Sequence, residues 1–183
     1  MRPFILMIFL ILTVCTSRAQ TFFPVDKSPM DLVYLPDHFA HDRTTGQQAI
    51  IKLYYSRPHK NDRDIFGAKV PYGKVWRTGA NEAVEFKAYQ DIKLAGKSLK
   101  AGTYSLFTIP EKTEWTIIIN QDLDYWGAYS YQEENDVLRV TVPSSKLETT
   151  VQTFSIRFQD LGDNQAVMRI AWDRTLVEVP IAY

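Results

Sequence analysis

The chain has one cysteine and three histidines, so the chemistry that these residues carry is largely excluded. A lone cysteine cannot form a disulfide within the chain, and a folded domain must then be stabilised by its core alone. The sequence also has no Gly-x-Ser-x-Gly nucleophile elbow and no Gly-x-x-x-x-Gly-Lys-Ser/Thr phosphate loop. We therefore expect no cofactor and assign no catalytic residue.

The chain has no excess of positive charge, with 21 basic and 21 acidic residues. Arg2 and Arg18 lie in the first 19 residues, which contain no acidic residue. Removal of those residues leaves 19 basic against 21 acidic side chains, a net charge of −2. Nucleic-acid-binding domains carry a basic patch or stripe. We therefore expect no nucleic-acid partner.

Long apolar runs are missing except at the start, where one extends from Phe4 to Val14 behind a short basic segment. Ser17 and Ala19 supply the small residues that precede a signal-peptidase cut. The run is shorter than the roughly 20 residues that a membrane-spanning helix needs. We therefore predict a signal peptide over residues 1–19, cut after Ala19, and an exported protein that is periplasmic or secreted.

Cys15 leaves an alternative to this prediction. A bacterial lipoprotein carries its lipid on a cysteine that follows a small residue, and such a protein would be anchored at Cys15. Val14 stands where the small residue is expected, which favours the soluble form. In that form Cys15 is discarded with the signal peptide.

The 164 residues after the cut suit one domain. Residues 20–47 contain Pro24, Pro29 and Pro36 and show no clean hydrophobic period, which predicts an extended N-terminal arm. Residues 48–183 are expected to form the domain itself.

Apolar residues alternate with polar ones along most of this domain, the pattern of half-buried strands. Alternating runs occupy 51–55, 84–88, 154–158 and 168–172, and the run 115–120 is apolar on both faces. Glycine, asparagine and aspartate residues separate the runs at short intervals. We predict an all-β fold, a single β-sandwich (jelly-roll-like or related) of about eight or nine strands.

The connection between the first two runs, residues 55–82, is long and rich in cations, aromatics and glycines. Its arginines offer planar forks for carboxylate, phosphate or sugar hydroxyls, and its tryptophan a flat apolar face. A second aromatic group follows at 125–131. The candidate ligand-binding residues are Arg57, Lys74, Trp76, Arg77, Asn81, Glu82, Trp126 and Tyr129.

A structural interpretation of the same connection stays open. Arg57 could pair with Glu82 or Asp64 and hold the loop down, and Trp76 could cap an open end of the sandwich. Ligand binding instead needs unpaired cations around a concave pocket.

Glycoside hydrolysis and zinc binding both depend on how side chains lie in space, which the spacing of residues in the sequence does not give. Glu82 could act with another acid, Asp124 for example, if the two faced each other across a cleft, as in glycoside hydrolases. His38 and His41 are suitable zinc ligands, but a single His-x-x-His in a proline-flanked arm is typical of solvated histidines. We assign no metal ligand.

Several motifs of the chain resemble the DUF2911 family. They are Tyr-Ser-Arg-Pro at 55–58, Ile-Phe-Gly at 65–67, the long run from Val70 to Glu82, the stretch 101–110 and Trp-Gly-Ala-Tyr at 126–129. The resemblance covers 55–181 and implies an exported protein, found mostly in Bacteroidetes, with no established activity. Some members carry an asparagine synthetase label, but this chain lacks a nucleotide-binding fingerprint and an N-terminal cysteine nucleophile.

Three hypotheses follow for a protein whose function is unknown. The first is a non-enzymatic exported domain that binds a small polar ligand or glycan through the long connection. The second is a glycan-directed hydrolase that uses Glu82. The third is a structural or partner-binding envelope protein, in which Arg57 and Glu82 are paired and buried. Oligomeric state is not predicted.

Overall fold

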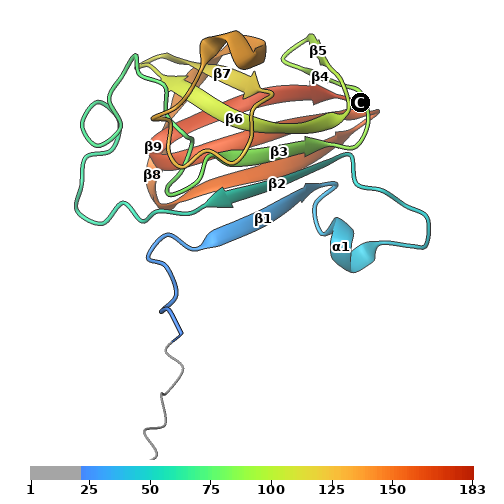
Figure 1. Ribbon diagram of the computed structural model, residues 1–183, viewed down its shortest axis with the longest axis horizontal. Helices are drawn as coiled ribbons and strands as arrows, with labels where there is room; N and C mark the ends of the chain where they lie inside the picture. The colour runs from blue at the N-terminus through green and yellow to red at the C-terminus, as the bar shows by residue number, and fades with distance from the viewer. Residues whose placement is uncertain (1–21) are drawn as a thin grey trace, which may run out of the picture.

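The computed structural model describes residues 22–183 as an antiparallel β fold with very little helix (Figure 1). Within this part of the chain, the helical segments are α1 (Phe39–Asp42) and the 3₁₀ turn η1 (Glu133–Asn135). The strands are β1 (Met30–Leu35), β2 (Ile51–Ser56), β3 (Val84–Ala88), β4 (Ile92–Leu94), β5 (Lys97–Leu99), β6 (Gly102–Pro110), β7 (Glu114–Asn120), β8 (Asp136–Gly162) and β9 (Gln165–Ala182). The predicted all-β class is confirmed.

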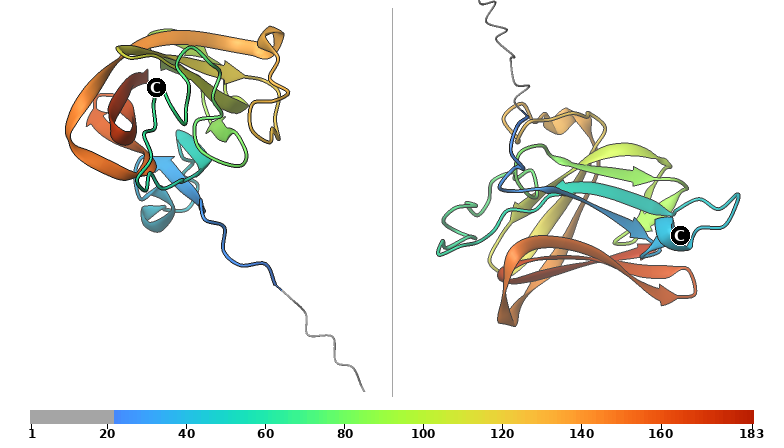
Figure 2. Two further views of the ribbon diagram at one scale, coloured as in Figure 1. Left: turned by 90° about the vertical axis from the view of Figure 1, so that its left-hand side faces the viewer. Right: turned by 90° about the horizontal axis from the view of Figure 1, so that it is seen from below.

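The nine strands described form one hydrogen-bonded sheet in the order β1-β2-β3-β6-β7-β8-β9-β4-β5. Strand β8 makes this possible, because residues 136–143 pair with β7 and residues 144–162 pair with β9. β8 and β9 curve round so that they face β2 and β3 across the core (Figure 2). The finer prediction of a jelly-roll-like sandwich is not confirmed, because the strands belong to one continuous sheet.

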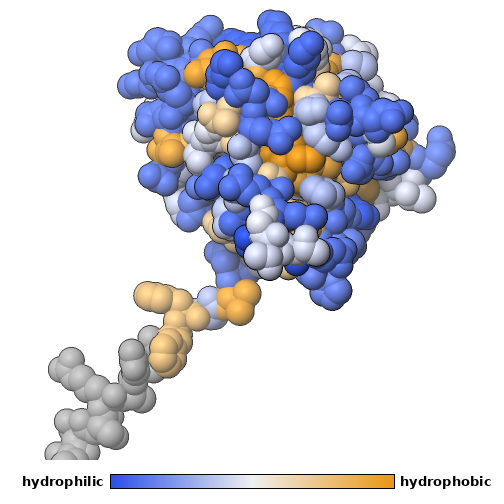
Figure 3. Space-filling model, turned by 90° about the vertical axis from the view of Figure 1, so that its right-hand side faces the viewer, coloured by the Kyte–Doolittle hydropathy of each residue, from blue (hydrophilic) through white to orange (hydrophobic). Residues whose placement is uncertain are grey.

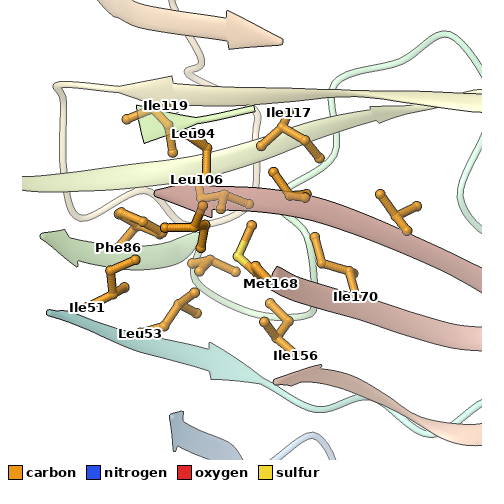
Figure 4. Packing of buried hydrophobic residues seen from close by; sticks show 14 of the residues in the cluster. Ile51, Leu53, Phe86, Leu94, Leu106, Ile117, Ile119, Ile156, Met168 and Ile170 are labelled. Carbon is orange, nitrogen blue, oxygen red and sulfur yellow. The ribbon is translucent and has the colours of Figure 1, made fainter. Parts of the chain in front are cut away.

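The core fills the space between the two parts of this curved sheet. Side chains that alternate along each strand point inward, as the period of two predicts. Ile51, Leu53 and Phe86 from β2 and β3 meet Ile156 and Met168 from β8 and β9 (Figure 4). Each such buried side chain stabilises the fold by about 1.5–3 kcal/mol. This burial stabilises the domain without a disulfide.

Tight hairpins join neighbouring strands where the sequence has turn residues. Ala95 and Gly96 connect β4 to β5, and Asp163 and Asn164 connect β8 to β9. All four residues have positive φ angles, between 45° and 82°. Two-residue turns with both φ angles positive match the right-handed twist of paired strands. The turn residues therefore determine where these hairpins form.

The predicted arm, residues 20–47, is only partly an arm. Residues 30–35 form strand β1, which pairs antiparallel with β2 at the edge of the sheet. Leu35 is fully buried and Val33 packs against the core, so this segment gains both backbone hydrogen bonds and burial. The apolar residues before it, Phe22 and Phe23, are exposed, and the chain there projects from the body (Figure 3).

The predicted signal peptide, residues 1–19, and Cys15 with it, lie outside the described residues. From residue 22 onward, the structure has no helix whose length and hydropathy would let it cross a membrane.

Candidate functional site

Two long connections lie together on one side of the sheet and carry all eight candidate residues. The first, residues 57–83, joins β2 to β3 at the left of Figure 1, and the second, residues 121–135, joins β7 to β8. Backbone hydrogen bonds tie them together, from Gly127 N to Asn81 O at 2.9 Å and from Ala83 N to Tyr125 O at 2.9 Å. The two connections therefore form one unit.

The first connection is also fixed to the sheet. Trp76 and Thr108 of β6 exchange two backbone hydrogen bonds, of 2.7 and 2.9 Å. Gly79 lies so close to β2 that an added Cβ would sit 2.8 Å from the carbonyl oxygen of Ser56. Because backbone cannot move aside cheaply, only glycine fits there. The site is therefore built on a rigid support.

Trp76 belongs to the main core. It is 8% exposed, its ring stacks on Trp172 with an interplanar angle of 12°, and Phe154 meets it edge-on at 5.3 Å. The indole Nε1 donates a hydrogen bond to the carbonyl oxygen of Gly79 at 3.2 Å. Its polar atom is satisfied, so Trp76 is a structural residue that also lines a pocket.

That pocket, which we call the Arg77 pocket, has a volume of about 350 Å³. Three cationic side chains line it, Arg63, Lys69 and Arg77, and no carboxylate does. Trp76 and Trp172 contribute aromatic surface, and Tyr129, which is 85% exposed, stands at its rim. The lining is completed by Ser28, Pro58, Val70, Gly79 and Ala80.

Arg77 is the exceptional side chain of this pocket. Its Nε is buried and has no hydrogen-bond partner, and within residues 22–183 the guanidinium forms no ion pair. Burial lowers the pKa of Arg77, with a smaller opposing effect from Tyr129. Arginine nevertheless remains charged in proteins. A partly buried cation without a partner is costly for folding and is suited to binding an anion.

The other candidate residues are not brought into this pocket. Of the eight, Trp76, Arg77 and Tyr129 line it. Lys74 and Trp126 are exposed and line none of the pockets described here. Asn81 donates from Nδ2 to Asp26 of the N-terminal segment at 3.0 Å.

Arg57 has a structural role. It donates to Asp31 Oδ2 at 2.7 Å, to Ser155 Oγ at 2.9 Å and to the carbonyl oxygen of Phe154 at 3.2 Å. It thereby joins β1 and β8 at the end of β2. The alternative in which Arg57 pairs with Glu82 or Asp64 is wrong, because β1 pairs with β2 and places Asp31 as the carboxylate partner of Arg57.

Glu82 lines a different and smaller pocket, of about 180 Å³, which we call the acidic pocket. Glu85 of β3 and Asp124 of the second connection line it too, with Tyr54, Ser105 and Tyr125 among the remaining residues. Three carboxylates from separate segments thus surround one hollow. The sequence alone could not place Glu82 and Asp124 together.

The histidines of the N-terminal region make only local contacts. His41 Nδ1 lies 2.6 Å from Asp42 Oδ1, and both side chains are exposed. Across residues 22–183, no group of three or more histidine, cysteine, aspartate or glutamate side chains is placed to hold a metal ion.

Sequence reasoning missed two cations of the Arg77 pocket, Arg63 and Lys69. Both lie in the connection that was singled out for its cations, and this composition was the available signal. Spacing could not show them beside Arg77, because the turn between residues 64 and 70 brings them there through backbone bonds such as Val70 N to Ile65 O.

Comparison with known proteins agrees with the motifs. Residues 37–181 match a family model described as "Protein of unknown function (DUF2911)". No curated protein and no solved structure matches the chain. The match covers well over half of the sequence and includes both connections that build the pockets. The chain therefore belongs to the DUF2911 family.

Proposed function

We propose that this protein is exported and that it binds a small anionic ligand in the Arg77 pocket without catalysing a reaction. The observation that carries the proposal is the partly buried guanidinium of Arg77, whose Nε has no partner in residues 22–183. Buried polar groups in native proteins nearly always have a partner, so an orphan one requires an explanation. An anion bound against this half-buried guanidinium would balance its charge.

The rest of the pocket fits a small ligand with an acidic group. Arg63 and Lys69 add positive charge, while the exposed ring of Tyr129 offers apolar surface for the body of the ligand. Arginine forks bind carboxylate and phosphate oxygens in pairs, and aromatic rings stack on flat ligand faces. Acidic sugars combine the two features, which links the pocket to the glycan hypothesis.

A thermal melt of residues 20–183 with paired sugars tests this function. Glucuronate or glucose 6-phosphate should raise the melting temperature, whereas glucose should not. A ligand at 100 times its dissociation constant adds about 2.7 kcal/mol to the free energy of unfolding. No shift with any acidic sugar would contradict the proposal.

Export is supported by the apolar run from Phe4 to Val14 and by Ser17 and Ala19 before the expected cut. The intact mass of protein secreted by a bacterial host should correspond to a chain that begins at Gln20. A chain that begins at a lipid-modified Cys15 would instead show a lipoprotein, and an uncut chain would contradict export.

The acidic pocket favours a second candidate, a glycan hydrolase that uses Glu82. Glycosidases place two carboxyl groups roughly 5–10 Å apart on either side of the scissile bond, and Glu82 and Asp124 line the same pocket. If this is the function, Glu82→Gln should abolish turnover of an envelope glycan and leave the melting temperature unchanged. Glu111→Gln, in the turn between β6 and β7, is the control. Equal turnover by wild type and Glu82→Gln would contradict the hydrolase.

A further inference from the structure

The Arg77 pocket carries more positive charge than one carboxylate would balance. We propose, on the basis of the function proposed above, that it selects a tetrahedral dianion, a phosphate monoester or free phosphate, over a planar carboxylate.

The first argument is charge. Arg63, Lys69 and Arg77 line the pocket, and none of them forms an ion pair within the part of the chain that the structure describes. Asp173, which follows the lining residue Trp172, is already paired with Lys60 at 3.8 Å. A phosphate monoester carries a charge of about −1.5 to −2 at pH 7, so it balances these cations better than a carboxylate does.

The second argument is that one cation is already oriented. Arg63 donates through Nε to the carbonyl oxygen of Lys60 at 2.9 Å and through Nη2 to that of His59. Its Nη1 has no acceptor among residues 22–183. Because these bonds hold the guanidinium, little conformational entropy is lost when it binds a ligand.

Lys69 lies in a turn that backbone hydrogen bonds hold in place. Val70 N donates to Ile65 O at 2.8 Å, and Gly67 N donates to Val70 O at 2.8 Å. The Lys69 side chain itself makes no hydrogen bond within residues 22–183. Its backbone is therefore fixed at the pocket while its ammonium group remains available for an anion.

The third argument is geometry. Arg63 lies just before the turn at residues 64–70, Lys69 lies within it and Arg77 follows it, so the three cations come to the pocket from separate points of the chain. A carboxylate has two coplanar oxygens, which suit one arginine fork, whereas a phosphate has three terminal oxygens that accept in several directions. A volume of about 350 Å³ suits a compact ligand of this kind.

The test uses four compounds built on one sugar ring: glucose, glucuronate, glucose 6-sulfate and glucose 6-phosphate. Their dissociation constants are measured by calorimetry with residues 20–183 at neutral pH and constant ionic strength, because salt screens such contacts. We expect glucose 6-phosphate to bind about tenfold or more tightly than glucuronate, a difference of about 1.4 kcal/mol, and glucose 6-sulfate to lie between them. Inorganic phosphate is measured alongside, and whether it or the ester binds more tightly distinguishes the two sources of the dianion.

Variants connect this preference to the cations. Arg63→Gln and Lys69→Gln should each reduce the ratio of the two affinities several-fold, while Lys74→Gln, an exposed lysine of the same connection, should leave it unchanged. A melt without ligand checks that each variant folds. Glucuronate that binds as tightly as glucose 6-phosphate would overturn the selectivity while leaving the proposed function intact. Binding of no anion at all would overturn the function itself.

Discussion

Replacement of Arg77 by glutamine should lower the affinity for glucuronate and for glucose 6-phosphate by about ten- to a hundredfold. Hydrogen bonds to a charged group contribute about 1.5–3 kcal/mol, and each 1.4 kcal/mol changes a dissociation constant tenfold. Arg77 supplies a half-buried guanidinium that forms no ion pair within residues 22–183. Calorimetric titration of the variant with both sugars gives the loss directly.

The same substitution should not destabilise the protein. Glutamine removes a half-buried cation for which no acidic partner is present in residues 22–183, so the free energy of unfolding in urea should stay constant or rise by up to about 1 kcal/mol. Lys74→Gln, at an exposed position, is the matched control for a lost positive charge. A large loss of stability in Arg77→Gln would mean that the guanidinium supports the fold, and the Arg77 pocket would then lose its main support as a binding site.

Replacement of Trp76 by alanine should lower the free energy of unfolding by about 3–5 kcal/mol, the usual cost of removing a large buried aromatic ring. The cluster that loses its centre comprises Phe66, Trp115, Phe154 and Trp172, whose ring centroids lie between 5.3 and 6.1 Å from that of Trp76. For a domain of this size the melting temperature should fall by roughly 6–20 °C. Urea unfolding followed by tryptophan fluorescence and circular dichroism measures the change.

Trp126→Ala is the matched control, because it removes the same side chain from the surface. Trp126 is 63% exposed, so the free energy of unfolding should change by no more than about 0.5 kcal/mol. Equal losses in the two variants would show that Trp126 is packed as tightly as Trp76. Equal but negligible losses would show that the connection 57–83 is not part of the core.

Local pattern predicted the strands well where one face is buried. The alternating runs at 51–55 and 84–88 correspond to β2 and β3 almost residue for residue, because inward and outward positions there differ sharply in polarity. The run at 154–158 is only a part of β8, a strand of 27 residues. Residues 144–153 of β8 are mostly exposed on both faces, so they carry no period that marks them as a strand.

The edge strand β1 was predicted as part of an irregular arm and not as a strand. Residues 30–35, Met-Asp-Leu-Val-Tyr-Leu, do not alternate between apolar and polar, and with three flanking prolines they predict an irregular arm. What makes the segment a strand is its pairing with β2 and the contact of Asp31 with Arg57, both of which depend on residues 16 to 26 positions away. Composition cannot report a partner of this kind.

The candidate site divides in a similar way. Composition alone selected the connection that lines the Arg77 pocket and three of that pocket's residues, because cations, aromatics and glycines gather there in excess. It also grouped Arg57 and Glu82 with them. In the folded chain, Arg57 lies at the junction of β1 and β8, and Glu82 lies in the acidic pocket.

The sequence by itself determined the all-β class, most of the strand positions, the family and the segment that carries the candidate site, because each of these depends on residues that are close together in the chain. Only the tertiary structure decided that β8 bends the sheet round its own core, and which cations share a pocket. These features depend on contacts between distant segments, such as Trp76 with Trp172. Whether a cation lies beside a carboxylate is decided by such contacts, and within residues 22–183 they place no carboxylate in an ion pair with Arg77.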